Sequence, residues 1–264
     1  SLSLTLYGDL DISTIDMLPY GRKKIRTRWI QPEQRDQAYE FLRKEVKSKR
    51  QAFVICPLID ESQTIQAKAA IDEHKYLSEH VYPDLRLGLL HGRMPLNEKQ
   101  RVMEIFQSGK LDILVSTPVV EVGIDVPNAT VMLIEGANRF GLAQLHQFRG
   151  RVGRGIHQSY CLLLAETASS DTRERLRVLE RTNDGFTVAE EDLNFRGPGD
   201  YLGKRQSGIA NLKMAKLTDQ DILKIARKEA ILILDSDSKL ESKEHMGLLY
   251  EMGRYAIENT AEIS

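Results

Sequence analysis

Apolar and polar positions alternate along the first two thirds of the chain in blocks that predict strands and helices in turn. Short apolar or alternating runs predict strands over residues 24–30, 52–56, 85–90, 112–116, 130–134 and 159–165. Apolar residues at helical spacing predict helices over residues 32–49, 64–80, 95–108 and 142–150. This order predicts an α/β fold, in which a mostly parallel sheet is covered by helices on both faces. Such sheets bind ligands at the carboxyl ends of their strands.

The pattern changes after Glu166, where strands give way to charged helices. We expect a helix over Ser170–Thr182 with Leu176 and Leu179 on its apolar side, and a second helix over Val188–Phe195. Gly197–Pro198–Gly199 is expected to break the second helix, and Gly203 to Gly208 to be irregular. Two further helices are predicted over 219–234 and 245–259. The expected domains are therefore 1–24, 25–166 and 167–264.

Composition places the chain among soluble globular proteins. Of its 264 residues, 41% are hydrophobic and 28% charged, and its net charge is −1, so any contact with nucleic acid must come from a local patch. Cys56 and Cys161 lie in apolar runs and are interpreted as buried strand residues, and no metal-ligand spacing is present. No run approaches membrane-spanning length, and Ser1–Tyr7 lacks the basic flank of a signal peptide. A reducing cytoplasm, without a membrane partner, is the expected location.

The strongest chemical signal is the Q-x-x-G-R-x-G-R pattern at Gln147–Arg154. It places Arg151 and Arg154 three residues apart in a segment that contains two glycines. A guanidinium is permanently charged, and its planar fork suits phosphate oxygens. Glycine lets a backbone approach a ligand or a facing domain closely. Taken alone, the same residues are also compatible with an ordinary solvated turn.

Two further stretches carry candidate ligand contacts. His91–Gly92–Arg93 lies between a predicted strand and a predicted helix, where a helix N-terminus favours phosphate, although a plain strand-to-helix turn would look similar. The second stretch runs from Ser116 to Asn128. Within it, Thr117 offers a hydroxyl, Gly123 allows close approach, and Asp125 offers a carboxylate.

Together with the strand Ala52–Leu58, these stretches resemble motifs IV, IVa, V and VI of the superfamily 2 helicases, in the same order. The resemblance implies that the α/β part is a RecA-like helicase lobe 2. It implies that Arg151 and Arg154 are fingers on the γ-phosphate of ATP, and that Gln147 is a third catalytic residue. It implies nucleotide binding by Gly123 and Asp125 with both arginines, and DNA contact by His91, Gly92, Arg93 and Thr117. One departure is Pro118, whose nitrogen cannot donate a hydrogen bond to a phosphate.

A longer stretch, Asn183–Gly208, resembles the translocation motif of the RecG and Mfd families, and Gly141–Gln147 is similar to both. In these families the motif forms a helical hairpin and a loop packed on lobe 2. Arg196 and Gln206 are expected to anchor the loop and couple hydrolysis to movement. Phe195–Gly199 and the short C-terminal tail favour the RecG family, and Mfd remains the alternative.

The sequence lacks the G-x-x-x-x-G-K-[ST] loop that cradles phosphates. Asp72–Glu73–His74–Lys75 only partly matches an acidic nucleotide motif and is interpreted as a solvated helix face. The resemblance therefore implies that the chain is a C-terminal fragment, with Leu4–Thr14 as the tail of lobe 1. ATP and Mg²⁺ would be held mainly by lobe 1, and the fragment alone would be inactive. The implied partners are branched double-stranded DNA and the lobe 1 and wedge domains of the parent. The alternative class is a non-catalytic DNA-binding or scaffold module.

Overall fold

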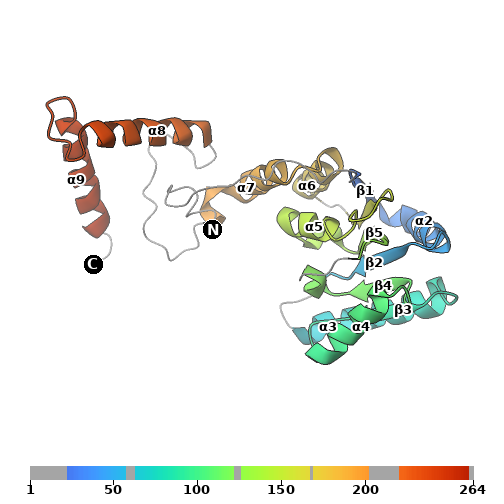
Figure 1. The fold of residues 1–264 in the computed structure, drawn as a ribbon. Coiled ribbons are helices and arrows are strands. Elements are labelled where there is room, and N and C mark those ends of the chain that lie inside the picture. Colours follow the sequence, from blue (N-terminus) through green and yellow to red (C-terminus); the bar gives the residue numbers. More distant parts are fainter. Residues whose placement is uncertain (1–22, 58–62, 122–125, 167–168, 202–219, 262–264) are drawn as a thin grey trace. The chain divides into compact units, whose positions relative to one another are not determined.

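The computed structural model describes residues 23–57, 63–121, 126–166, 169–201 and 220–261. Its centre is a sheet of six parallel strands in the order β1-β6-β5-β2-β4-β3 (Figure 1). The predicted parallel α/β fold is confirmed. Because every connection crosses over, the carboxyl ends of all six strands meet at one edge of the sheet.

Each observed strand agrees with its predicted range to within two residues at both ends. Their bounds are β1 Arg26–Ile30, β2 Gln51–Ile55, β3 Leu87–Leu90, β4 Ile113–Ser116, β5 Ala129–Ile134 and β6 Tyr160–Leu164. In β2, alternate side chains enter opposite cores: Phe53 and Ile55 face one, and Ala52 and Val54 face the other. A strand buried on both faces needs a continuous apolar run, as the sequence has here.

The helices on the lobe cover both faces of the sheet. Their bounds are α2 Arg35–Lys47, α3 Gln63–Tyr76, α4 Leu96–Gln107, α5 Leu142–Arg149, α6 Ser170–Arg181 and α7 Gly185–Tyr201. Short turns of helix are η1 Pro32–Gln34, η2 Leu77–Val81, η3 Pro118–Glu121 and η4 Ala137–Arg139. Residues of α2, α3 and η2 belong to one core, and those of α4, α5 and α6 to the other.

Helix α6 packs directly on the α/β lobe. Leu176 and Leu179 are buried as predicted, and α6 contacts β1, α5 and η4. Its N-terminus is capped by Ser169, whose hydroxyl accepts from the N–H of Thr172. Arg175 donates to the carbonyl oxygens of Asn138 and Phe140 at 3.3 and 3.4 Å, which ties α6 to η4.

The expected break at Gly197–Pro198–Gly199 is wrong, because α7 continues through these residues to Tyr201. Proline in a helix loses one hydrogen bond and crowds the carbonyl four residues earlier, a penalty of about 3 kcal/mol that surrounding structure can override. Here Pro198 lies only three residues before the end of the helix. At its other end, α7 begins three residues earlier than predicted, because Asp184 accepts hydrogen bonds from the N–H groups of Phe186 and Thr187 at 3.2 and 3.1 Å.

Among the described residues, one compact unit extends to Phe195 and a second begins at Arg196. The second unit contains the helices α8 Gln220–Ser236 and α9 Met246–Ala261, both predicted from the sequence. They are joined by a turn in which Asp237 accepts from the N–H groups of Glu241 and Ser242 and binds His245. In the first unit, Cys56 and Cys161 are free thiols buried in the sheet, as predicted.

Candidate functional site

Two of the candidate stretches meet at the carboxyl ends of β3 and β4. The N–H of Thr117, just after β4, donates to the carbonyl oxygen of Leu90, the last residue of β3, at 3.1 Å. Gly92 lies against Val119, since a Cβ at position 92 would be 3.6 Å from the Val119 Cγ2. The structure therefore brings His91–Arg93 beside Thr117 and η3, as a shared binding surface requires.

His91 sits in a basic environment. Burial, together with the positive charges of Lys99 and Arg93, lowers the pKa of His91, so its imidazole is neutral at pH 7. Its Nδ1 is buried and has no hydrogen-bond partner among the described residues. Lys99 donates to the Gly92 carbonyl oxygen at 2.6 Å, while Gly92 and Arg93 are exposed. Lys99 was not singled out from the sequence, because its role depends on a turn that brings residues 92 and 99 together.

The hydroxyl of Thr117 is buried, and the residue is only 2% exposed. Its Oγ1 has no hydrogen-bond partner among the described residues. Leaving such a group unpaired costs about 1–3 kcal/mol. Gly123 and Asp125 of the same stretch lie outside the described residues.

The third stretch follows α5. Gln147 is exposed on the last turn of the helix, Arg151 is half-buried and Arg154 is exposed. The chain continues in tight turns after Arg149, and the Nε of Arg154 donates to the Gly150 carbonyl oxygen at 3.3 Å. Because η3 contacts α5, this stretch lies next to the stretch 116–128, which contains η3.

Two glycines fix the path of the chain around Arg154. Gly153 has a φ of +75°, in the left-handed region that side chains disfavour, and a Cβ there would lie 2.9 Å from Ile25. Gly155 packs on the backbone, because a Cβ at that position would be 2.5 Å from the carbonyl oxygen of Pro127. Arg154 thus lies between two glycines in close contact with their neighbours: Gly153 with the Ile25 side chain, and Gly155 with the Pro127 backbone near the end of the stretch 116–128.

Arg149, which the sequence reasoning passed over, is the largest fully buried side chain of the lobe. It donates to the carbonyl oxygens of Leu179 and Thr182 at 2.9 and 2.7 Å, and it lies 2.8 Å from the Nδ1 of His146. Burial lowers the pKa of Arg149, and these acceptors compensate for lost hydration. Its burial could not be read from a segment rich in arginine, where solvent exposure is the usual state.

His146 extends this link to the start of α7. A Cβ on Gly185, the first residue of α7, would lie 3.2 Å from the His146 Nε2, so the two elements are in close contact. Burial and the neighbouring Arg149 lower the pKa of His146, which favours a neutral ring that accepts from Arg149. The helix that carries Gln147 therefore contacts both the end of α6 and the start of α7. Arg196 lies in α7, but its side chain and all of Gln206 lie outside the described residues.

A second polar cluster, also missed from the sequence, follows β5. Glu135 is 5% exposed and accepts from Arg35 at 2.9 Å and from the hydroxyl of Tyr39 at 3.0 Å. Burial and the charge of Glu135 raise the pKa of Glu73 to about 7. The interpretation of Asp72–Lys75 as a solvated face is therefore wrong for Glu73, which turns toward this cluster while Asp72 and Lys75 stay exposed. Helical spacing alone did not distinguish the two carboxylates.

Among the residues that the structure describes, no three His, Cys, Asp or Glu side chains are grouped so as to hold a metal ion. None of the helices in these ranges is long and apolar enough to cross a membrane. The ligand chemistry that the site does offer is cationic, through Arg93, Lys99, Arg151 and Arg154.

Family models match two parts of the chain. Residues 33–155 match the helicase conserved C-terminal domain. Residues 182–260 match the model described as ATP-dependent DNA helicase RecG, domain 3, C-terminal. The first match contains all the stretches around the carboxyl ends of the strands, and the second contains α7, α8 and most of α9.

Similar proteins carry the same description. The ATP-dependent DNA helicase RecG of Synechocystis is 51% identical over 92% of this chain and 29% of its own length. The RecG of Bacillus subtilis is 44% identical over 100% of this chain and 39% of its own length. A solved structure of RecG bound to a three-way DNA junction is 47% identical, with a TM-score of 0.67, over 84% of this chain and 28% of that one. The chain thus spans about a third of the relatives' length.

The parallel sheet and the motifs at its carboxyl edge define the RecA-like C-terminal lobe of a superfamily 2 helicase. Within that class, the chain belongs to the RecG family and corresponds to the C-terminal part of its members. The match over residues 182–260 favours this family over Mfd.

Proposed function

We propose that this chain is the C-terminal helicase lobe of an ATP-dependent DNA helicase that remodels branched DNA. The observation that carries the proposal is the contact between Gly155 and Pro127, which seats exposed Arg154 directly beside the stretch 116–128. The proposal is that a nucleotide-binding surface and a DNA-binding surface adjoin each other here. The names of the relatives support ATP and DNA as the ligands.

Arg151 and Arg154 are proposed to stabilise negative charge on the γ-phosphate from across an interlobe cleft. Their forked guanidiniums suit the phosphoryl oxygens, and such arginines are worth roughly 10³–10⁵ in rate. Gln147, exposed one turn earlier on α5, is proposed as a third catalytic contact. Gly123 and Asp125 are proposed to lie beside the nucleotide.

Bound ATP with Mg²⁺ would supply the transferable phosphoryl group and neutralise its developing charge. We propose that both are held mainly by an N-terminal lobe, because these 264 residues contain no phosphate-cradling loop. The residues described here fit a complementary role: they offer cations and glycine-lined backbone, with no grouped metal ligands among them.

The proposed DNA contacts are His91, Gly92, Arg93 and Thr117, of which Thr117 is buried and would have to turn outward to reach DNA. Arg93 is exposed and can contact a phosphate directly, and Lys99 adds a second cation to the same turn. The neutral His91 can donate to a phosphate or a sugar without adding charge. We propose branched double-stranded DNA as the substrate, and lobe 1 and a wedge domain of the same protein as partners.

Coupling is proposed to run from α5 to the hairpin. Arg149, which is two residues before Arg151, binds the end of α6. A shift of the nucleotide contacts would therefore also move α6. Arg196 and Gln206, farther along, are proposed to carry the movement to a loop on the DNA. Such a chain of packed contacts with two arrangements is a physical route for coupling.

The test compares this chain with the complete protein, meaning one that also carries the N-terminal lobe. The complete protein should hydrolyse ATP when forked DNA is present and should unwind the fork. The 264-residue chain should do neither and should not bind ATP tightly. DNA-stimulated ATPase activity from the chain alone would contradict the assignment of roles. A complete protein that binds forked DNA but hydrolyses no ATP would instead support a non-catalytic module.

A further inference from the structure

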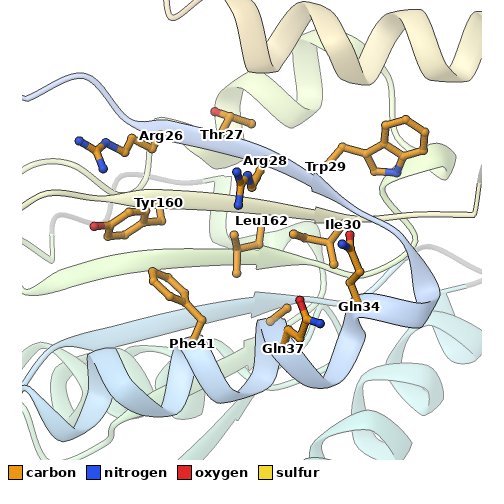
Figure 2. Close-up of a pocket in the computed structure, with 11 residues that line it drawn as sticks. Arg26, Thr27, Arg28, Trp29, Ile30, Gln34, Gln37, Phe41, Tyr160 and Leu162 are labelled. Atoms are coloured by element: carbon orange, nitrogen blue, oxygen red, sulfur yellow. The ribbon is translucent and has the colours of Figure 1, made fainter.

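A groove lies at the β1 edge of the sheet, away from β3 and β4, where His91 and Thr117 are found. It has a volume of about 630 Å³ and runs between β1, β6 and helix α2. Figure 2 shows Arg26 and Arg28 along β1, Phe41 and Tyr160 at one end, and Gln34 and Gln37 at the other. Of the motif stretches, no residue that the structure describes lines this groove.

The charge of the groove has one sign. Among the described residues that line it, only Arg26 and Arg28 are charged, and both are exposed. Within the described part of the chain, neither forms an ion pair. Side chains two apart on a strand point to the same face, about 7 Å from each other. The groove therefore offers two guanidiniums in a row to an anion.

The aromatic end of the groove offers a different contact. The rings of Phe41 and Tyr160 meet edge to face, with centroids 4.8 Å apart, and both side chains are half-buried. Gln34 and Gln37, both exposed on the helical wall, add amide donors and acceptors. Cations along a track, aromatic faces and amides are the groups that hold single-stranded nucleic acid.

The outer edge of β1 is poorly suited to an added peptide strand. The N–H of Arg26 donates to Ser159, so the N–H groups of Thr27 and Trp29 point away from β6. The Trp29 N–H is already taken by the Glu180 carboxylate at 2.7 Å. An extended peptide would lose that backbone contact, and it would meet the acidic Glu180. Recognition in the groove must therefore come mainly from side chains, which favours a ligand with charged phosphates and flat bases.

We propose that the groove bounded by Arg26, Arg28, Phe41 and Tyr160 binds single-stranded DNA, with the guanidiniums on phosphates and the aromatic pair against a base. This site lies beyond the motifs of the proposed function and needs no ATP. It would hold a strand displaced from a branched DNA substrate while the proposed DNA contacts at His91–Arg93 hold another part of the same DNA. The choice of DNA rather than RNA rests on the proposed function.

The experiment measures the fluorescence anisotropy of a dye-labelled oligothymidylate, because the indole of Trp29 packs on the face of the sheet opposite Phe41 (Figure 2). The labelled oligothymidylate is titrated with the 264-residue chain at several salt concentrations. Arg26→Ala/Arg28→Ala should weaken binding about tenfold or more. The negative slope of log affinity against log salt should also become shallower by about 1.4, since each phosphate contact on a single strand contributes about 0.7 to its magnitude.

Lys68→Ala/Lys75→Ala is the matched control, because it removes the same charge from exposed positions on α3. It should leave affinity and slope unchanged. Phe41→Leu should weaken binding with the salt slope intact, which separates stacking from charge. Circular dichroism confirms that each variant is folded. The proposal is overturned if the arginine variant matches the lysine control, or if oligoglutamate binds and oligothymidylate does not. Either failure leaves fork-stimulated ATPase activity, the test of the proposed function, unaffected.

Discussion

The Arg149 guanidinium donates to the carbonyl oxygen of Thr182 at 2.7 Å, which joins helix α5 to the end of α6. A second bond reaches Leu179 at 2.9 Å, so one buried side chain closes the last turn of α6. Arg151 lies two residues after Arg149 in the sequence. The nucleotide contacts proposed here therefore lie two residues from a buried link to α6.

Arg149→Ala should destabilise the first unit by on the order of 3 kcal/mol, because two buried carbonyls lose their donor and a large cavity opens. Arg149→Lys should rescue only part of this, since one ammonium does not reproduce the fork. Urea unfolding measures the loss, with Arg177→Ala on the exposed side of α6 as control. Hydrogen exchange should show faster opening of the last turn of α6. A decrease in the free energy of unfolding no larger than that of the control would mean that Arg149 does not hold α5 and α6 together.

Gly155→Ala should destabilise the chain and disturb Arg154, because the new Cβ would lie 2.5 Å from a backbone carbonyl that has little room to move. Gly92→Ala is the matched control, since its Cβ would make an ordinary contact at 3.6 Å. Thermal unfolding should show a clearly lower melting temperature for Gly155→Ala. The free energy of unfolding of the control should change by no more than about 0.5 kcal/mol. Equal melting temperatures would show that the contact between the two stretches is loose.

Glu73 should make stability fall as pH rises. Its pKa is about 7 in the folded chain against 4.5 in its ordinary state, so the folded form holds the proton more tightly between these values. The free energy of unfolding therefore decreases as pH rises from 4.5 to 7, and the penalty is complete above pH 7. Glu73→Gln should raise the melting temperature at pH 8 and match the unmodified chain below pH 4.5. Asp72→Asn, at the exposed neighbour, should show no such pH-dependent gain.

Arg196→Ala and Gln206→Ala should uncouple hydrolysis from movement in the complete protein. Both residues follow the α/β lobe and flank a glycine-rich segment, so they are badly placed for phosphoryl transfer and well placed for a moving loop. The expected result is substantial DNA-stimulated ATPase activity with fork unwinding largely lost. Both rates should be measured on one forked substrate, with Arg173→Ala on α6 as control. A parallel decrease of the two rates would mean that these residues serve folding or nucleotide chemistry.

The sheet could be predicted because parallel strands buried on both faces need unbroken apolar runs, and Phe53–Ile55 and Met132–Ile134 are such runs. The strand order could not, because periodicity says nothing about which strands pair. The end of α7 was misplaced because helix-breaking residues carry only local penalties. The helix continues through Pro198 to Tyr201 in spite of them.

The site residues were predicted to the extent that motif spacing determines position. His91 and Thr117 do lie together, because both follow neighbouring strands. Arg149 and Glu73 were missed for a shared reason: charged residues are usually solvated, and their burial depends on partners far away in sequence. Arg149 binds the carbonyl oxygen of Thr182, and burial together with the like charge of Glu135 raises the pKa of Glu73.

The central claim is that Arg154 completes an ATP-hydrolysing site, and Arg154→Lys in the complete protein tests it most directly. DNA-stimulated turnover should decrease by about 10³-fold, while ATP affinity stays within a few-fold, because the arginine acts chiefly in the transition state. Arg173→Lys, an equivalent change at an exposed position on α6, should have no effect. Near-normal turnover in Arg154→Lys would contradict the proposed role of this lobe.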